Sequence, residues 1–220
     1  MGPWTSQPVL PLLRAPAVRA VSLGGGYVRL PDGYVLALVP PGRPRMPNGH
    51  RFLPRPPEPG AEFCTARLGP PGQPWNPVPV PAFRLVLPAP GAPPDPVLLA
   101  GRGPGLTPEG DDFLVGYAAG LVLWHGRRSE AAAVAEAAAP LTTALSATLL
   151  WHAARGELPE PAHVLLESGD PGPLLSFGSS SGRALLRGLA FGCASHDAGT
   201  GLPVKRLDEL LEGSDESLPA

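Results

Sequence analysis

Two proline-rich segments limit what the first hundred residues can form. Residues 40–60 read PPGRPRMPNGHRFLPRPPEPG, and residues 69–81 read GPPGQPWNPVPVP. No α-helix can continue through prolines at this density, because each proline lacks the backbone donor and its ring clashes with the preceding turn. We therefore interpret both segments as rigid surface loops, or in part as strands at the edge of a sheet.

Short β-rich runs occupy the remainder of this part of the chain. VRAVSL at 18–23 and YVRLPDGYVLALV at 27–39 are rich in β-branched residues, and Pro31-Asp32-Gly33 within the second run is typical of a hairpin turn. Further short strands are predicted for EFCTARL at 62–68, FRLVL at 83–87 and PVLLA at 96–100, the last leading into a glycine-rich loop.

From Thr107 onward the pattern becomes helical. A helix is predicted over 108–125, with Pro108 in its first turn, where proline is favoured. An alanine-rich stretch at 129–156 follows, which Pro140 divides in two, and further helices are predicted over 160–168, 179–194 and 204–213. Strands followed by helices indicate an α+β fold. We expect a β-rich N-terminal part, residues 1–100, for which a small barrel is one possible form, packed on a helical part, residues 101–220.

Composition excludes several classes of function. The hydrophobic fraction of 43% is enough for a core despite 33 prolines and 28 glycines. The formal net charge of −2, without a basic stripe, argues against nucleic-acid binding. The apolar run from Phe113 to Trp124 is too short to span a membrane, and no secretion signal is recognisable, so we expect a soluble, cytoplasmic protein. Sparse Asn, Gln, Met and Cys resemble heat-adapted proteins, although GC-rich codon bias gives the same composition.

Single residue types narrow the chemistry further. Lys205 is the one lysine, so no glycine-rich turn carries a phosphate-loop lysine. Cys64 and Cys193 match no metal or redox spacing, and we interpret them as free thiols.

The stretch GRGPGLTPEGDD at 101–112 carries the first candidate site. Thr107 is a good N-cap, and the acids that follow complement the positive end of a helix. Gly103 and Gly105 allow the backbone to approach a ligand closely. A helix start that follows a strand and a glycine loop binds anions through backbone N–H groups. A well-capped helix with two solvent-facing acids is the alternative interpretation.

Asp111 and Asp112 then raise a geometric problem. Neighbours in a helix point about 100° apart, so both side chains cannot avoid the apolar faces around them. At least one carboxylate therefore needs a partner, either an arginine, backbone N–H groups or a metal. Carboxylates meet phosphate oxygens most often through Mg²⁺. We hypothesise that Asp111 and Asp112 are catalytic, with one binding Mg²⁺ and the other acting as a base or orienting group.

A second small-residue loop, FGSSSGRALLRGL at 177–189, also precedes a helix. Gly178, Ser180, Ser181 and Gly182 would supply ligand contacts, and together with Gly103, Gly105 and Thr107 they would form a shared anion pocket. Simple serine capping is the alternative. GSSSG also fits the letters of a Gly-x-Ser-x-Gly nucleophile elbow, although no acid–histidine pair can be assigned to it. Thr142, Ser146 and Thr148 are interpreted as helix residues that bond back to the backbone, and His125 and His152 as helix C-terminal caps.

The motif GLTPEGDDFLVG at 105–116 resembles a bacterial family that includes one subunit of oxamate carbamoyltransferase. That family typically shows Gly-Leu-Thr-Pro-Ser-Gly-Asp-Asp-Phe-Leu, and Glu109 replaces the serine here. A later Gly-His-Ser-Ser-Gly-like element is similar to Gly178–Gly182, with Ser179 where histidine is common. The acid that often follows is replaced near Ala184.

The resemblance implies carbamoyl transfer involving a phosphate-bearing small molecule of the carbamoyl phosphate class. The chain would be a transferase or one subunit of a multi-protein enzyme, with partner subunits or as a homo-oligomer. A non-catalytic assembly or regulatory subunit is the alternative. Whether the chain is itself an enzyme stays open at this point.

Overall fold

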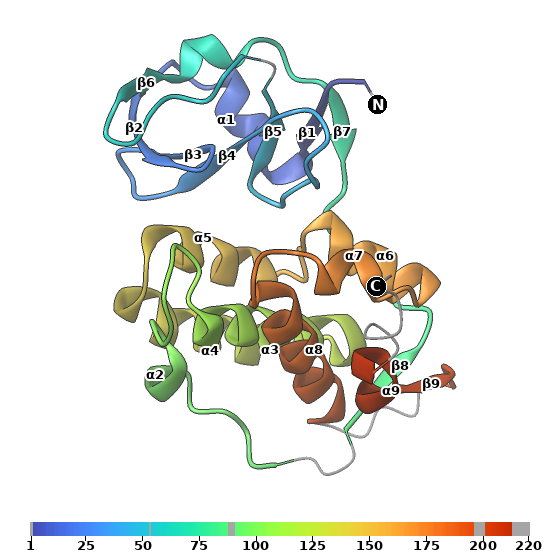
Figure 1. The fold of residues 1–220 in the computed structure, drawn as a ribbon. Helices are drawn as coiled ribbons and strands as arrows, with labels where there is room; N and C mark the ends of the chain where they lie inside the picture. Colours follow the sequence, from blue (N-terminus) through green and yellow to red (C-terminus); the bar gives the residue numbers. More distant parts are fainter. Residues whose placement is uncertain (1, 53, 88–90, 196–200, 213–220) are drawn as a thin grey trace, which may run out of the picture. The chain divides into compact units, whose positions relative to one another are not determined.

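The computed structural model describes residues 2–52, 54–87, 91–195 and 201–212. The chain divides into two compact units, Met1–Pro77 and Val78–Ala220 (Figure 1). The first unit holds a sheet and the second is mainly helical, which confirms the α+β class. Residues 78–100, which the sequence assigns to the β-rich part, belong in the structure to the second unit.

The first unit is built on a seven-stranded mixed sheet with the order β6-β2-β3-β4-β5-β1-β7. Most strands have only three residues. Their bounds are β1 (Trp4–Ser6), β2 (Arg19–Gly24), β3 (Tyr27–Arg29), β4 (Val35–Val39), β5 (Gly49–Arg51), β6 (Glu62–Cys64) and β7 (Gln73–Trp75). Short helical turns accompany them as η1 (Gln7–Val9), α1 (Leu10–Arg14) and η2 (Thr65–Leu68).

The predicted hairpin is confirmed, and the barrel is not. Strands β3 and β4 pair antiparallel, and the Asp32 carboxylate accepts the Tyr34 N–H at 3.0 Å within the turn. The sheet is open, with β6 and β7 as its two edges. Pro74 lies in β7 and has no N–H to donate, which suits an edge strand and opposes closure.

Sequence analysis does not predict strands β1 and β5, because each is short and has polar residues. β5 is an interior strand, although its segment is predicted to be a loop or a sheet edge. Its His50 ring is buried, with Nδ1 3.0 Å from the Thr5 hydroxyl and Nε2 2.8 Å from the Leu68 carbonyl oxygen. Burial lowers the pKa of His50. The core beside it contains the edge-to-face pair Phe52 and Phe63, with ring centroids 5.7 Å apart.

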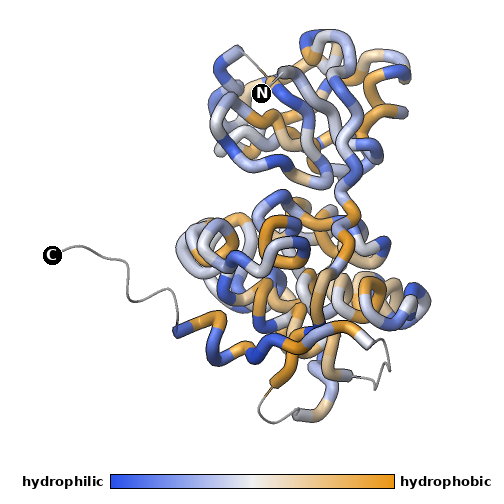
Figure 2. Tube along the Cα trace, turned by 90° about the vertical axis from the view of Figure 1, so that its right-hand side faces the viewer, coloured by the Kyte–Doolittle hydropathy of each residue, from blue (hydrophilic) through white to orange (hydrophobic). Residues whose placement is uncertain are grey.

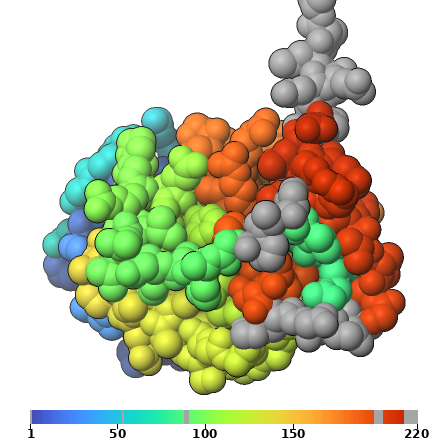
Figure 3. All heavy atoms as spheres, turned by 90° about the horizontal axis from the view of Figure 1, so that it is seen from below, coloured from blue at the N-terminus to red at the C-terminus, as the bar shows by residue number. Residues whose placement is uncertain are grey.

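Helices form most of the second unit. They are α2 (Pro96–Leu99), α3 (Glu109–His125), α4 (Arg128–Ala138), η3 (Ala139–Leu141), α5 (Ala144–Ala153), α6 (Glu160–Ser168), α7 (Gly172–Leu175), α8 (Ser181–Ala194) and α9 (Leu207–Glu212). A two-stranded parallel sheet joins β8 (Arg84–Val86) to β9 (Val204–Arg206), and Figure 3 shows the teal β8 segment beside the red C-terminal residues. The division of the alanine-rich stretch at Pro140 is confirmed.

Three local predictions need correction. PVLLA is the helical turn α2, because the Asp95 side chain accepts the Val97 N–H at 2.9 Å and Pro96 fits a first turn. EFCTARL is a strand only over β6, since η2 follows it. The predicted helix over 204–213 begins as strand β9, and its last residue lies outside the described residues.

Helix α3 is the centre of the second unit. Buried residues lie on every side of it, so it behaves as a core helix with no solvent-facing stripe. Figure 2 shows hydrophobic segments, in orange, in many parts of this unit. Helix α8 runs beside it in the same direction, as contacts near the start, middle and end of both helices show. No helix of the described residues is long and apolar enough to cross a membrane.

Candidate functional site

Four glycines set the distance between α3 and α8. A Cβ on Gly116 would lie 2.2 Å from the Leu185 carbonyl oxygen, and one on Gly188 would lie 2.0 Å from that of Phe113. Gly120 and Gly192 meet each other farther along, where a Cβ on Gly120 would lie 2.8 Å from the Gly192 Cα. Each helix therefore carries a Gly-x-x-x-Gly pair at the interface. Sequence analysis missed this signal, which predicts close backbone packing.

The parallel packing brings the two small-residue loops together. The Thr107 hydroxyl lies 3.4 Å from the Ser181 hydroxyl, which joins the start of α3 to the start of α8. Gly182 allows the start of α8 to pack closely against Leu174, because a Cβ at this position would lie 1.7 Å from the Leu174 carbonyl oxygen. The two loops thus meet as expected, and anion binding between them stays a prediction.

The start of α3 differs from the predicted one. The helix begins at Glu109 with Pro108 at the N-cap position, so Thr107 does not cap it. The Gly110 N–H donates to the Arg102 carbonyl at 2.9 Å, and the next two N–H groups donate to the Pro108 carbonyl. These three backbone N–H groups at the start of α3 therefore already donate to carbonyl groups of the same segment.

The glycines of this loop have distinct environments. Gly103 has a φ of +115°, and a Cβ there would lie 2.9 Å from the Glu109 nitrogen, so the loop closes over the helix start. Gly105 has a φ of +97° with open space around it. Both positions favour glycine through their backbone conformation.

Asp111 ties the loop to its surroundings. Its side chain is fully buried; Oδ1 accepts the Gly101 N–H at 2.7 Å, and Oδ2 accepts the Thr142 hydroxyl. The Thr143 hydroxyl donates to the Leu106 carbonyl at 2.6 Å, a second link between the same two segments. Each carboxylate oxygen of Asp111 thus has a donor within the chain. These two hydrogen bonds hold the glycine loop against the segment that contains Thr142.

Asp112 has a different environment. Its residue is 6% exposed, and the nearby Ser181 and Thr107 hydroxyls, which lie 3.4 Å from each other, lower the pKa of its carboxyl group. Oδ2 is buried, and no donor among the described residues pairs with it. The Asp112 site is defined here as Thr107, Asp112 and Ser181. The expectation that a helical aspartate pair cannot escape apolar surroundings is confirmed, since both residues are buried.

Burial raises the pKa of Asp112 to about 7. This value already includes smaller upward effects of the negative charges of Asp111 and Glu109 and a downward effect of hydrogen bonding from Ser181 and Thr107. The carboxyl group can therefore gain or lose a proton near neutral pH, a property that general acids and bases require.

Metal binding by Asp111 and Asp112 stays a prediction. Within the described part of the chain, no three His, Cys, Asp or Glu residues are grouped so that they could hold a metal ion. Asp111 and Asp112 also face different partners, so they do not present a common pair of oxygens. A Mg²⁺ ion here would depend on water and ligand oxygens for its other contacts.

The serine loop does not form a nucleophile elbow. The element before it is the short helix α7, which ends at Leu175, and not a strand, so the strand–turn–helix geometry of that motif is missing. Ser180 stands at the N-cap position of α8 without a side-chain capping bond, and Gly178 turns the chain with a φ of +68°.

Most of the other polar candidates have structural contacts, but the prediction that Ser146 bonds back to the backbone is wrong, because its buried hydroxyl has no hydrogen-bond partner among the described residues. Thr148 bonds back to the Ala144 carbonyl at 2.9 Å, as predicted, whereas Thr142 precedes α5 and binds Asp111. The buried His152 ring meets the Glu157 carboxylate at 2.5 Å, and Arg155 meets the same carboxylate at 2.9 Å. Sequence analysis missed this cluster, because Glu157 follows the helix that carries His152.

A comparison with protein families identifies most of the helical unit. Residues 99–193 match the family model of the oxamate carbamoyltransferase subunit AllH, which confirms the resemblance carried by GLTPEGDDFLVG. The match runs from the last residue of α2 to Cys193 in α8 and covers less than half of the chain. No curated protein and no solved structure matches the sequence.

Proposed function

We propose that the chain is a carbamoyltransferase-type protein, acting alone or as a subunit, which binds a carbamoyl-bearing anion at the Asp112 site. The buried, unpaired Oδ2 of Asp112 carries the proposal. A buried acceptor without a donor is costly, so a ligand that donates a hydrogen bond there would recover that free energy. The family match supports the same class of chemistry.

The chemistry of a carbamoyl group suits this acceptor. The group ends in an –NH₂, which donates hydrogen bonds, and carbamoyl phosphate and oxamate each join it to an anionic end. The ionised Asp112 would accept from the –NH₂, with Ser181 and Thr107 beside it. The anionic end would face the first turn of α8, whose N-cap Ser180 makes no side-chain capping bond.

The predicted site residues then take separate roles. Asp112 would exchange the proton, and Thr107 and Ser181 would contact the ligand. Asp111 would be a positioning residue, since its oxygens already bind Gly101 and Thr142. The glycines at 103, 105, 178 and 182, with Ser180, would shape the two loops. Mg²⁺ would act as the counter-ion of a bound phosphate.

Paired ligands test the proposal by calorimetry on the full chain. Oxamate and oxalate differ in the –NH₂ alone, and we expect oxamate to bind at least about tenfold more tightly, the factor that one hydrogen bond to a charged group supplies. Carbamoyl phosphate is compared with inorganic phosphate, with and without Mg²⁺. Asp112→Asn should abolish the preference, and Glu136→Gln, at an exposed position of α4, should retain it. Equal affinity for oxamate and oxalate would refute the proposed contact.

A non-catalytic assembly or regulatory subunit is the second candidate. Large apolar side chains are exposed near the glycine loop, with 56% for Val97, 62% for Leu98, 44% for Leu106 and 50% for Leu141. Apolar side chains gathered in this way suit a partner protein. Sedimentation velocity with and without co-expressed neighbouring gene products distinguishes the two. A complex that Leu98→Glu disrupts, with no ligand binding by the chain alone, would favour this candidate.

A further inference from the structure

Two side-chain oxygens of the second unit are buried without a hydrogen-bond partner among the described residues. One is Oδ2 of Asp112 on α3, and the other is the hydroxyl of Ser146 on α5, a residue that is 1% exposed. A buried hydroxyl without a partner costs free energy, which an alanine at the same position would avoid. A ligand that accepts a hydrogen bond from Ser146 would recover that free energy.

Ser146 lies beside the segment that carries the Asp112 site. Its backbone N–H donates to the Thr143 hydroxyl at 3.1 Å, and that hydroxyl donates to the Leu106 carbonyl at 2.6 Å. Leu106 directly precedes Thr107, a member of the Asp112 site. The first turn of α5 is therefore hydrogen-bonded to the loop from which this site is built.

The Ser146 side chain lies on the buried face of α5. Leu150 follows it one turn later on the same face and is fully buried. Just before this helix, the Thr142 hydroxyl binds the Asp111 carboxylate, so the same end of α5 also meets the first turn of α3. Asp112 is the next residue of that turn. The two unpaired oxygens thus belong to the neighbouring first turns of two packed helices.

A carbamoyl group presents two hydrogen-bonding functions on one carbon, an –NH₂ that donates and a carbonyl oxygen that accepts. Asp112 in its ionised form only accepts, so it can bind the –NH₂ but not the carbonyl. A serine hydroxyl can donate, and that of Ser146 has no acceptor among the described residues. The two unpaired oxygens are therefore complementary to the two functions of the group.

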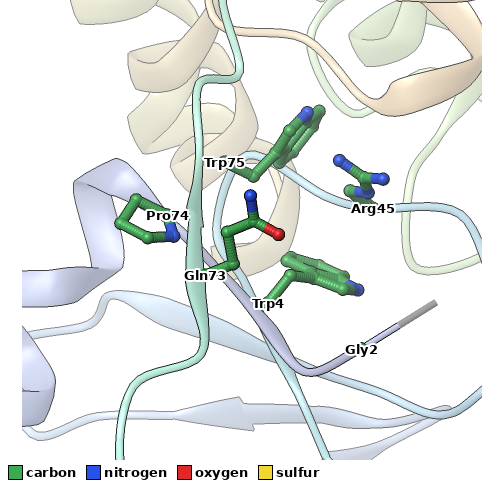
Figure 4. A pocket seen from close by; sticks show the side chains of 6 residues that line it. All are labelled: Gly2, Trp4, Arg45, Gln73, Pro74 and Trp75. Carbon is green, nitrogen blue, oxygen red and sulfur yellow. The ribbon is translucent and has the colours of Figure 1, made fainter.

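The hollow of the first unit offers no comparable pair of oxygens among its described residues. It measures about 310 Å³ and is lined by Gly2, Trp4, Arg45, Gln73, Pro74 and Trp75. Figure 4 shows the Arg45 guanidinium beside the Trp75 ring, and its central carbon lies 5.8 Å from the ring centroid. This cation is thus already in contact with an aromatic ring. The complementary pair is found instead on α3 and α5.

We propose that the Ser146 hydroxyl donates to the carbonyl oxygen of the ligand whose –NH₂ is bound by Asp112. The site then selects primary amides and carbamoyl compounds, in which both groups share one carbon. The inference rests on the proposed function, because it assigns the second contact of the same ligand. It makes Ser146, which lies outside the GLTPEGDDFLVG motif, a specificity-determining residue.

Calorimetry with oxamate and oxalate on the full chain tests the contact. Both compounds carry an oxygen at the carbonyl position, whereas only oxamate carries the –NH₂. Ser146→Ala should weaken both at least about threefold, the effect of one lost hydrogen bond, and should retain the preference for oxamate that depends on Asp112. The matched control is Ser168→Ala on α6, whose exposed hydroxyl bonds back to the Val164 carbonyl at 2.6 Å, and it should leave both affinities unchanged.

Thermal stability separates a ligand contact from a structural role. Ser146→Ala removes a buried hydroxyl that has no partner, so we expect the Tm of the ligand-free chain to rise by at least about 2 °C while the affinity falls. A structural hydroxyl would instead lower both quantities when removed. If Ser146→Ala does not fold, Ser146→Cys, whose thiol is a weaker donor, should weaken oxamate in its place.

The failure of this proposal and that of the proposed function are distinguishable. A parent that prefers oxamate over oxalate, with both affinities unchanged in Ser146→Ala, would overturn this proposal and leave the proposed function standing. Equal affinity of the parent for the two compounds would overturn both. A lower Tm in Ser146→Ala, or an equal loss of affinity in Ser168→Ala, would also overturn the assignment of Ser146.

Discussion

Replacing either adjacent aspartate by asparagine removes one ionisable group and almost no volume, yet we expect the two changes to affect stability in opposite directions. Asp112 is a buried acid whose pKa is raised from 3.8 to about 7. The folded state therefore holds this proton more tightly than the unfolded state. The stability from Asp112 is fully present below pH 3.8 and is lost as the pH rises through about 7.

The magnitude follows from the size of the shift. One pKa unit corresponds to about 1.4 kcal/mol, so the shift represents about 4 kcal/mol of unfolding free energy at pH 8 and about 1.5–2 kcal/mol at pH 5. Asp112→Asn removes this dependence. Its gain over the parent should be about 2–3 kcal/mol larger at pH 8 than at pH 5, or about 5–10 °C in Tm for a chain of this length.

Asp111→Asn should destabilise the protein at both pH values. An amide nitrogen would replace one carboxylate oxygen and face a donor, either the Gly101 N–H or the Thr142 hydroxyl. Losing one hydrogen bond to a charged group costs about 1.5–3 kcal/mol.

Denaturant unfolding of parent and variants at pH 5 and pH 8 checks both expectations. Differences between parent and variant cancel the titration of other groups such as His50 and His152. If the Asp112→Asn difference is the same at both pH values, Asp112 does not titrate near neutrality and the argument for its proton exchange fails. A gain in stability from Asp111→Asn would contradict its role as an anchor of the loop.

Two further predictions concern packing and the buried histidine. Gly188→Ala gains helix propensity of about 1 kcal/mol but places a methyl group 2.0 Å from the Phe113 carbonyl oxygen. We expect a net loss of about 1–3 kcal/mol in calorimetry, with Ala133→Ser on the exposed face of α4 nearly neutral. Glu157→Gln should cost about 1.5–3 kcal/mol at pH 7. Burial alone would raise the pKa of Glu157, but hydrogen bonds from His152 and Arg155 lower it, so the cost should shrink as the pH falls below 4.5 in urea titrations.

Local signals in the sequence predicted much of the helical unit correctly. Helix α3 was predicted to within one residue because Pro108 lies at its start, as the N-cap residue, and Pro140 divides the next stretch as expected. Strand β5 was missed, since its three residues Gly49–Arg51 show no hydrophobic alternation and are held by neighbours distant in sequence. PVLLA was predicted as a strand because a short apolar run does not distinguish a strand from a helical turn.

The features of the candidate site also divide into those that the sequence determined and those that only the tertiary structure decided. The sequence by itself determined that at least one of the two aspartates meets an apolar face, because a helix turns about 100° per residue, and the structure buries both. It also contained the GLTPEGDDFLVG motif that the family match confirms. Only the tertiary structure decided that Asp111 anchors a loop through Thr142 while Asp112 faces Ser181 with one oxygen unpaired. Those partners lie dozens of residues away, and the glycines between α3 and α8 bring them together by letting two backbones touch.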